Sequence, residues 1–169
     1  MNKFLLFLVF IPFSGIASES FIHEHPDYKA SIDLVERLGK HQVIKQTVTM
    51  QREQLEKYGS NIDSHLSVLR ILGSGFAMTQ TVKFQFDKWI NELNEQLISL
   101  GKKQLTRADA IKFFEPSGII YNQQIKLTCL NPSTRGLIDS GIDYISTYYD
   151  QDMVYIDEIV INKKACSSD

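Results

Sequence analysis

Two histidines alternate with other residues in the stretch FIHEHPDYK, residues 21–29. Imidazole nitrogens are ligands for zinc, copper and nickel, and His23 and His25 would share one side of an extended backbone. A stable metal site needs three or four convergent ligands, whereas this segment supplies two histidines. Asp27, directly after Pro26, is well placed to cap a helix. The stretch therefore predicts a capping leader to the first helix, with metal binding by His23 and His25 as the alternative.

Residues 1–17 have the three parts of a secretory signal peptide: the positive Lys3, an apolar run from Phe4 to Phe13, and a small-residue end. The apolar run is too short to cross a bilayer. No Cys stands at the cleavage region to carry a lipid. We expect cleavage after Ala17, with cleavage after Ser20 as the alternative. The signal predicts an exported protein, periplasmic or secreted and bacterial, without a membrane span.

The position of the cut decides a second metal hypothesis. Cleavage after Ser20 would start the mature chain at Phe21, so that the terminal amine, two amides and the imidazole of His23 form a square-planar set suited to Cu(II) or Ni(II). Cleavage after Ala17 would make His23 the sixth residue and would remove this geometry. Apart from this conditional site, the sequence predicts no cofactor.

The chain has two cysteines, Cys129 and Cys166. In an oxidising compartment an even count predicts one disulfide, and closing a loop of this length contributes roughly 4 kcal/mol in the chain-entropy model. A redox-active thiol is disfavoured because there is no C-x-x-C motif. We therefore predict a structural Cys129–Cys166 disulfide.

Aromatic side chains are the strongest indication of an interaction surface. Tyrosine combines a large apolar ring with a polar tip and is common at interfaces, although aromatic pairs also stabilise hairpins from within. Phe84 lies off the apolar stripe of its predicted helix, so it is either a core residue or an exposed contact. The candidate interaction residues are Tyr144, Tyr148, Tyr149, Tyr155 and Phe84.

Catalytic motifs are weak. Ser74 in G-S-G lacks the strand–turn–helix context of a nucleophile elbow, and Ser117 is typical of a turn. His41 and His65 fall on predicted helices without a metal-binding partner one turn away. The sequence therefore favours a non-enzymatic protein. A small hydrolase with a carboxylate or serine site between the helices and the sheet is the alternative.

Composition excludes one class of partner. The chain has 18 basic and 20 acidic residues, and the basic ones are interleaved with acids along its length. A nucleic-acid-binding protein would cluster Lys and Arg on one face. We expect no nucleic acid as partner.

Residues 18–104 predict a helical region of about four helices. Gly39 and Gly59 stand where the first two helices should end. Ser60 begins a third, with its apolar stripe running to Leu72 and its end at residues 73–75. The fourth and longest runs to Leu100, although its start alternates with period two and would also suit a strand.

Residues 105–169 predict an α+β region. A short helix follows Thr106, which with Asp109 resembles a capping box. Residues 119–130 alternate apolar and polar side chains and predict a strand with Cys129 facing the core. Two further β-rich runs, joined near residues 150–152, predict an antiparallel hairpin. The predicted fold class is therefore α+β: N-terminal helical hairpins, a short helix, and a three-stranded antiparallel sheet with one disulfide, packed as one unit.

Together these patterns predict an exported, non-enzymatic protein-binding module, associated with the envelope or with host interaction, whose partner is another protein. Besides the hydrolase, the remaining alternative is a carrier of a small apolar ligand, with the region from Phe84 to Leu100 lining its pocket.

Overall fold

The computed structural model describes residues 19–167, and the predicted signal peptide lies outside them. After the short α1 (Glu19–Ile22), helices α2 (Pro26–Leu38) and α3 (Lys40–Tyr58) end at Gly39 and Gly59, as predicted. Both glycines have positive φ, +77° and +87°, which side chains with a Cβ rarely adopt. The cap of α2 differs from the prediction. His25, and not Asp27, is the N-cap, and its Nδ1 accepts a hydrogen bond from the Asp27 backbone N–H.

The predicted third helix is wrong. Residues 66–84 form a β-hairpin, in which β1 (Leu66–Ser74) pairs antiparallel with β2 (Ala77–Phe84). A β-bulge between Val68 and Arg70 shifts the register of this pair. Leu66, Val68 and Ile71 therefore face the core with unequal spacing, which hides the period of two that marks a strand.

The long helix begins later than its apolar pattern suggested. α4 spans Phe86–Ser99, directly after β2. A loop leads to α5 (Arg107–Ile111), where Thr106 and Asp109 do form the predicted capping box.

The strand predicted for residues 119–130 is also wrong, because this segment is the helix α6 (Ile119–Cys129). It buries Ile120, Gln124 and Thr128, four residues apart, while Ile119 and Leu127 are exposed. Helix α7 (Pro132–Asp139) follows, capped by the side chain of Asn131, which accepts a hydrogen bond from the Thr134 N–H.

The predicted C-terminal hairpin is present as β3 (Asp143–Tyr149) and β4 (Tyr155–Ile161). The described residues form one four-stranded sheet of order β1-β2-β3-β4, in place of the predicted three-stranded antiparallel one. It is mixed, because β2 and β3 run parallel. The fold is thus α+β, as predicted, with a sheet that joins both parts of the chain.

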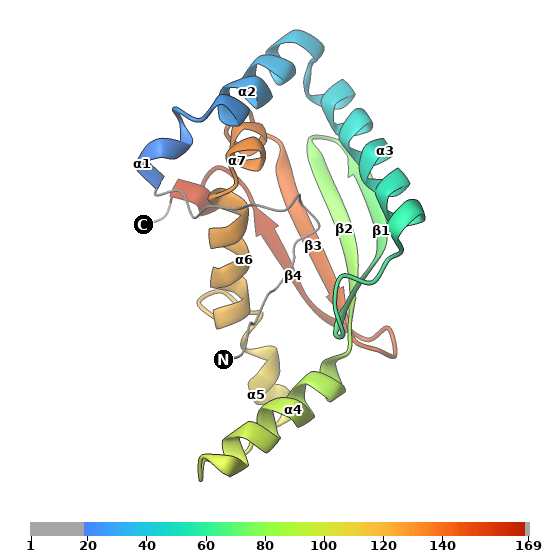
Figure 1. Cartoon of the computed structure of the whole chain (residues 1–169), viewed down its shortest axis with the longest axis vertical. Coiled ribbons are helices and arrows are strands. Elements are labelled where there is room, and N and C mark those ends of the chain that lie inside the picture. Colours follow the sequence, from blue (N-terminus) through green and yellow to red (C-terminus); the bar gives the residue numbers. More distant parts are fainter. Residues whose placement is uncertain (1–18, 168–169) are drawn as a thin grey trace.

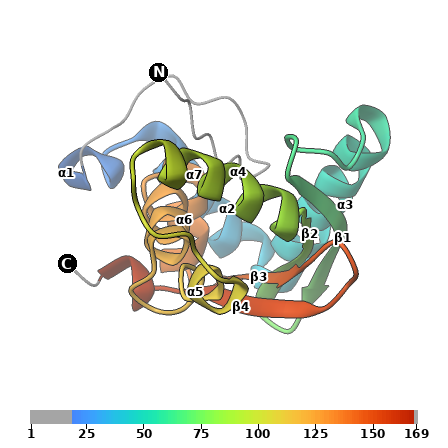
Figure 2. The ribbon, with the colours of Figure 1, turned by 90° about the horizontal axis from the view of Figure 1, so that it is seen from below.

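The helices lie on one face of this sheet, with α6 along β3 and β4 and α3 along β1 (Figures 1 and 2). Alternate residues of β3, Tyr144, Ser146 and Tyr148, point into the core between the two layers. α3 approaches β1 closely at Gly73, where a Cβ would overlap the side chain of Ile44. Among residues 19–167, no helix is long and apolar enough to span a membrane.

The predicted disulfide joins Cys129 to Cys166, whose Cα atoms are 5.4 Å apart. It does not link two strands, as the strand prediction for residues 119–130 implied. It ties the end of α6 to a short 3₁₀ helix, η1 (Ala165–Ser167), that follows β4.

Candidate functional site

A cavity of about 610 Å³ opens between α4, the start of α6 and the sheet. Its volume falls in the range of small-molecule and side-chain binding pockets. The walls are mostly aromatic and aliphatic, with a few polar groups. The lining residues are Asp63, His65, Leu66, Phe84, Trp89, Leu93, Phe113, Phe114, Ser117, Gly118, Ile119, Ile120, Gln123 and Tyr148.

Phe84 and Trp89 come to this cavity from adjoining elements. Phe84 is the last residue of β2, and α4 begins two residues later. Within α4, Trp89 and Leu93 are four residues apart, so they lie one turn apart on the same face of the helix. The rings of Phe84 and Trp89 are 5.3 Å apart, and those of Phe84 and Phe114 are 5.7 Å apart. The Phe114 ring lies 5.2 Å from that of Tyr148. These near-perpendicular and tilted pairs form a preorganised aromatic wall.

The rim of the cavity carries charge. Asp63 accepts hydrogen bonds from the backbone N–H groups of His65 and Leu66, at 2.6 and 2.8 Å, which fixes the start of β1. Nε2 of His65 lies 3.0 Å from a carboxylate oxygen of Glu92 on α4, an ion-pair distance without well-formed hydrogen-bond geometry. Nδ1 of His65 lies 3.0 Å from the hydroxyl of Ser64.

Behind the aromatic wall runs a chain of buried polar groups. The hydroxyl of Tyr148 donates to the side-chain oxygen of Gln124, whose amide N–H donates to Ser146 at 2.7 Å. Gln80 on β2 donates to the same serine, also at 2.7 Å. Burial raises the pKa of Tyr148, although the bonds to Gln124 and Ser146 act in the opposite direction, so the phenol stays neutral. These bonds hold α6 to the middle of the sheet.

An arginine clamp fixes α4 and α5 to the β3–β4 hairpin. Arg107 pairs with Asp87 at 2.7 Å and with the almost fully buried Asp150, and its guanidinium lies over the ring of Phe86. Burial alone would raise the pKa of Asp150, but hydrogen bonds from the Val154 N–H and from Arg107 hold it below its ordinary value. Asp150 is therefore an ionised structural group.

The predicted interaction residues divide between two places. Tyr144, Tyr148 and Phe84 are buried, so they cannot form a direct outer contact surface, although Tyr148 and Phe84 line the cavity. Tyr149 and Tyr155 pair at 6.0 Å on the hairpin, and 54% of Tyr155 is exposed.

The predicted histidine pair does not converge. The Nδ1 atom of His23 lies 4.0 Å from Asp139 and its ring packs edge-on against Tyr28, while His25 caps α2. Within residues 19–167 there is no group of three or more His, Cys, Asp or Glu side chains arranged to hold a metal. Metal binding by His23 and His25 stays a prediction.

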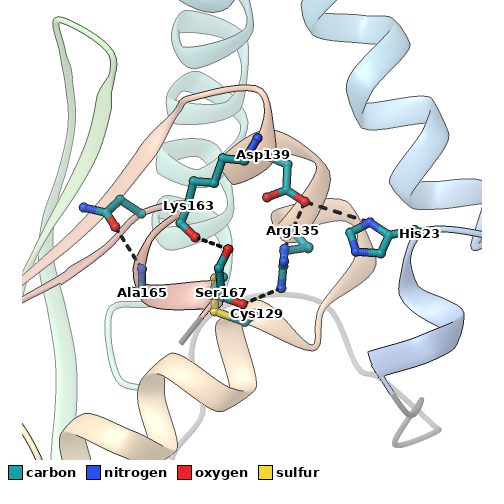
Figure 3. Close-up of a disulfide and its surroundings, with 9 residues drawn as sticks. His23, Cys129, Arg135, Asp139, Lys163, Ala165 and Ser167 are labelled. Atoms are coloured by element: carbon teal, nitrogen blue, oxygen red, sulfur yellow. Dashed lines mark hydrogen bonds and ion pairs between the residues drawn. A yellow bond between two sulfur atoms is a disulfide. The ribbon is translucent and has the colours of Figure 1, made fainter. Parts of the chain in front are cut away.

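The disulfide lies beside a buried ion pair (Figure 3). The Nε atom of Arg135 donates to Asp139 at 3.0 Å, and a second guanidinium nitrogen donates to the carbonyl of Cys166, also at 3.0 Å. Tyr28 on α2 donates to the same carboxylate oxygen of Asp139. Burial, followed by this contact with Asp139, raises the pKa of Tyr28. The disulfide region thus connects α2, α6, α7 and η1.

A serine and a histidine, the residue types that a hydrolase could use, line the cavity, but they are not paired with each other. Ser117 and His65 both line it, and Ser117 has the unusual φ of +77°. The ring nitrogens of His65 face Ser64 and Glu92, so His65 does not act as a base for Ser117 in this arrangement. Two acids of the last hairpin are likewise engaged: Asp150 binds Arg107, and Glu158 accepts a hydrogen bond from Thr147.

Sequence reasoning missed most of the cavity. It placed Phe84 and the following helix at an apolar pocket only in the carrier alternative, and Trp89 and Leu93 do line the cavity. Nothing in the sequence marks Phe113 and Phe114 as cavity residues, and the strand predicted for residues 119–130 misplaces Ile119. The usable signal was the density of aromatic residues between Phe84 and Phe114.

No protein-family model matches the chain, and no curated protein matches its sequence. Among solved structures, it is similar to EpsS, the pilotin of the type 2 secretion system of Vibrio vulnificus, with 14% identity, a TM-score of 0.50, and coverage of 77% of this chain and 97% of that one. The type II secretion pilotin AspS from Vibrio cholerae gives 13% identity, a TM-score of 0.48, and coverage of 75% and 95%. A protein from Pseudomonas aeruginosa thought to be secreted gives 10%, 0.43, and coverage of 73% and 96%. The likeness to EpsS, at 14% identity, is one of fold alone.

Proposed function

We propose that this chain is an exported, non-enzymatic binding module of the bacterial envelope, which holds an apolar segment of a partner protein in the cavity between α4 and α6. The observation that carries the proposal is the cavity itself, an apolar pocket of about 610 Å³ with a charged rim. Pockets of this kind use apolar walls for affinity and a few polar groups for orientation.

A protein segment suits this cavity because the apolar wall continues to the outside. Ile119 lines the cavity at the first turn of α6, and 58% of it is exposed. An occupant that covers Ile119 must extend beyond the cavity, as a helix or strand of another protein would. Asp63, which lines the cavity, and Glu92, which lies against the lining residue His65, favour a partner with basic residues beside its apolar anchors.

The similarity in fold to EpsS also supports a protein-binding role. EpsS, whose fold is shared at a TM-score of 0.50, is a pilotin of a type 2 secretion system. We extend to this chain the proposal of a pilotin-like role, in which it binds a protein of an envelope assembly. The exported location is part of this proposal, and mass spectrometry of the native N-terminus tests it.

Site-specific photo-crosslinking in the native host tests the proposal. A photoreactive residue at position 119 should crosslink one reproducible protein, whereas the same residue at Leu69, which is also apolar and 45% exposed but does not line the cavity, should not. Leu93→Arg, which places a charge in the cavity, should abolish the crosslink from position 119. Equal capture from both positions, or capture that survives Leu93→Arg in a folded protein, would reject the proposal.

A carrier of a small apolar ligand is the second candidate, favoured by the aromatic walls. Trp89 is the sole tryptophan of the chain and lines the cavity, so its fluorescence reports directly on occupancy. A carrier should shift the emission of Trp89 on titration with a fatty acid and should retain a bound lipid in native mass spectrometry. A binding module without a small ligand should show neither effect.

A further inference from the structure

The C-terminal end of α4 exposes aliphatic side chains beside adjacent lysines. Ile98 is 55% exposed and Leu100 is 67% exposed, and Lys102 and Lys103 follow directly. From residue 96 to residue 108 the chain contains no acidic residue. Apolar and positive groups therefore meet at one end of the molecule, where α4 points away from the sheet (Figure 1).

This end of α4 is held in place by several hydrogen bonds. Gly101, with φ of +66°, ends the helix, and the N–H of Lys102 bonds back to the carbonyl of Leu97 at 2.8 Å. The side chain of Asn94 bonds both the N–H and the carbonyl of Leu105, at 2.7 and 3.0 Å, which closes the loop onto the helix. The fold thus fixes Ile98 and Leu100 in solvent, at the cost of leaving apolar surface hydrated.

The nearest acids along the chain offset the charge of the lysines only in part. Asp109 is engaged mainly by the hydroxyl and the N–H of Thr106 in the capping box and lies 3.7 Å from Lys112, and Lys103 makes a smaller electrostatic contribution to its lowered pKa. On the other side the first acid is Glu95, a helical turn further from the end than Ile98. The tip itself carries positive charge alone.

We propose that residues 98–103, the tip of α4, bind the surface of a lipid bilayer that contains anionic lipids. Aliphatic side chains next to lysines are the combination that inserts shallowly at an anionic membrane surface. Lysine is depleted at protein–protein interfaces, so a protein partner suits this tip less well. The exposed Met153 and Val154 of the β3–β4 hairpin lie beside Asp152, and that acidic surface does not suit an anionic membrane.

Vesicle flotation tests this proposal. The protein is purified after export, with its N-terminus established by mass spectrometry, and mixed with vesicles of phosphatidylcholine alone or with 30% phosphatidylglycerol. We expect binding to the anionic vesicles, weakening as salt rises, and little binding to the neutral ones. Ile98→Ser/Leu100→Ser and Lys102→Glu/Lys103→Glu should each weaken binding by about tenfold or more, since each lysine near an anionic surface and each buried aliphatic chain contributes measurably.

Matched control variants are available on the same chain. Lys163→Glu/Lys164→Glu reverses another exposed lysine pair, and Met153→Ser/Val154→Ser removes another exposed apolar pair. Both should bind like the unmodified protein. All variants are first shown to be folded by their denaturant unfolding. The proposal fails if the unmodified protein floats with neither vesicle or equally with both, or if a control pair weakens binding as much as the tip pairs. Crosslinking of position 98 to a protein, without vesicle binding, would assign the tip to a protein partner instead.

Discussion

At the scale of single residues, buried polar side chains connect the layers of this fold. Ser146 at the centre of the sheet accepts from both Gln80 and Gln124, and Tyr148 closes the chain of bonds. Asp150 also connects elements, at the hairpin end of the sheet, where it accepts hydrogen bonds from Arg107 and from backbone N–H groups of the turn. Because buried polar groups are costly when unpaired, such residues should tolerate substitution poorly.

Asp150→Asn should lower the free energy of unfolding by about 2 kcal/mol at pH 7, the scale of lost hydrogen bonds to a buried charge. The pKa of Asp150 is lower in the folded protein than its ordinary value. Its stabilising effect is therefore fully present above about pH 4 and is lost as the pH falls through the lower folded pKa. The stability difference between Asp150→Asn and the unmodified protein should shrink in the same range.

Denaturant unfolding between pH 7 and pH 3 measures this difference. Asp152→Asn is the control, because Asp152 belongs to the same turn but is exposed. A pH-independent difference for Asp150→Asn, or an equal effect of Asp152→Asn, would contradict the assignment.

His23 gives a conditional copper prediction. If Phe21 proves to be the first residue, Cu(II) should bind the terminal amine, two amides and the imidazole of His23, and His23→Ala should abolish that binding. In the structure Ile22 belongs to α1 and is 1% exposed. Cleavage after Ser20 removes Glu19 and Ser20 from α1, and wrapping residues 21–23 around the metal would draw Ile22 out of its buried position, so copper should lower the melting temperature. Copper titration with thermal unfolding checks both effects; equal affinity of His23→Ala would end the hypothesis.

At the scale of elements, helices whose buried face is apolar could be predicted from the sequence. α3 buries Val43, Ile44 and Val48 and ends at Gly59, so both period and boundary are visible. α6 misled the prediction because its buried face includes Gln124 and Thr128 while Ile119 and Leu127 face solvent. The apolar residues of α6 therefore do not mark its core face, and their alternation is accidental.

The strand β1 was hidden for a different reason. Its bulge at Val68 and Arg70 changes the spacing of the core-facing residues, and Leu66, Leu69 and Leu72 then mimic a helical stripe. The cavity was predictable only in part, since it depends on how β1, α4 and α6 are placed in three dimensions. No pattern within any one segment records that placement.

The contact between α3 and β1 gives an element-scale prediction. Gly73→Ala should destabilise the protein by about 1–3 kcal/mol, because the new methyl group overlaps the side chain of Ile44. In an Ile44→Ala background the same change should cost much less, giving a coupling of about 0.5 kcal/mol or more. Denaturant unfolding of the four proteins measures the cycle. If the effects of Gly73→Ala and Ile44→Ala on the free energy of unfolding are additive, α3 does not pack against Gly73 as described.

At the scale of the whole molecule, the disulfide holds the segment after the last strand against the helical layer. Cys129 and Cys166 are 37 residues apart. Cys129→Ser/Cys166→Ser should lower the free energy of unfolding by about 4 kcal/mol in the chain-entropy model. The carbonyl of Cys166 also accepts from Arg135, so η1 should lose this contact when the link is cut.

Guanidinium unfolding of this double variant, compared with the oxidised and the reduced unmodified protein, tests the effect. The double variant should have the same free energy of unfolding as the reduced unmodified protein. Peptide mapping without reductant should recover the linked pair from the native protein, and two free thiols there would contradict a structural disulfide.

The parallel pairing of β2 with β3 constrains how the chain reaches this structure. Residues 85–142, including α4 to α7, lie between the two strands, whereas β1–β2 and β3–β4 are each joined by short turns. Closing so long a loop is entropically expensive, so the two hairpins should form early and the middle of the sheet late. Until they pair, β2 and β3 each expose an unpaired strand edge. Such edges promote aggregation by pairing with strands of other chains. The slow step of folding and the greatest risk of aggregation should therefore coincide, at the seam between the two halves of the sheet.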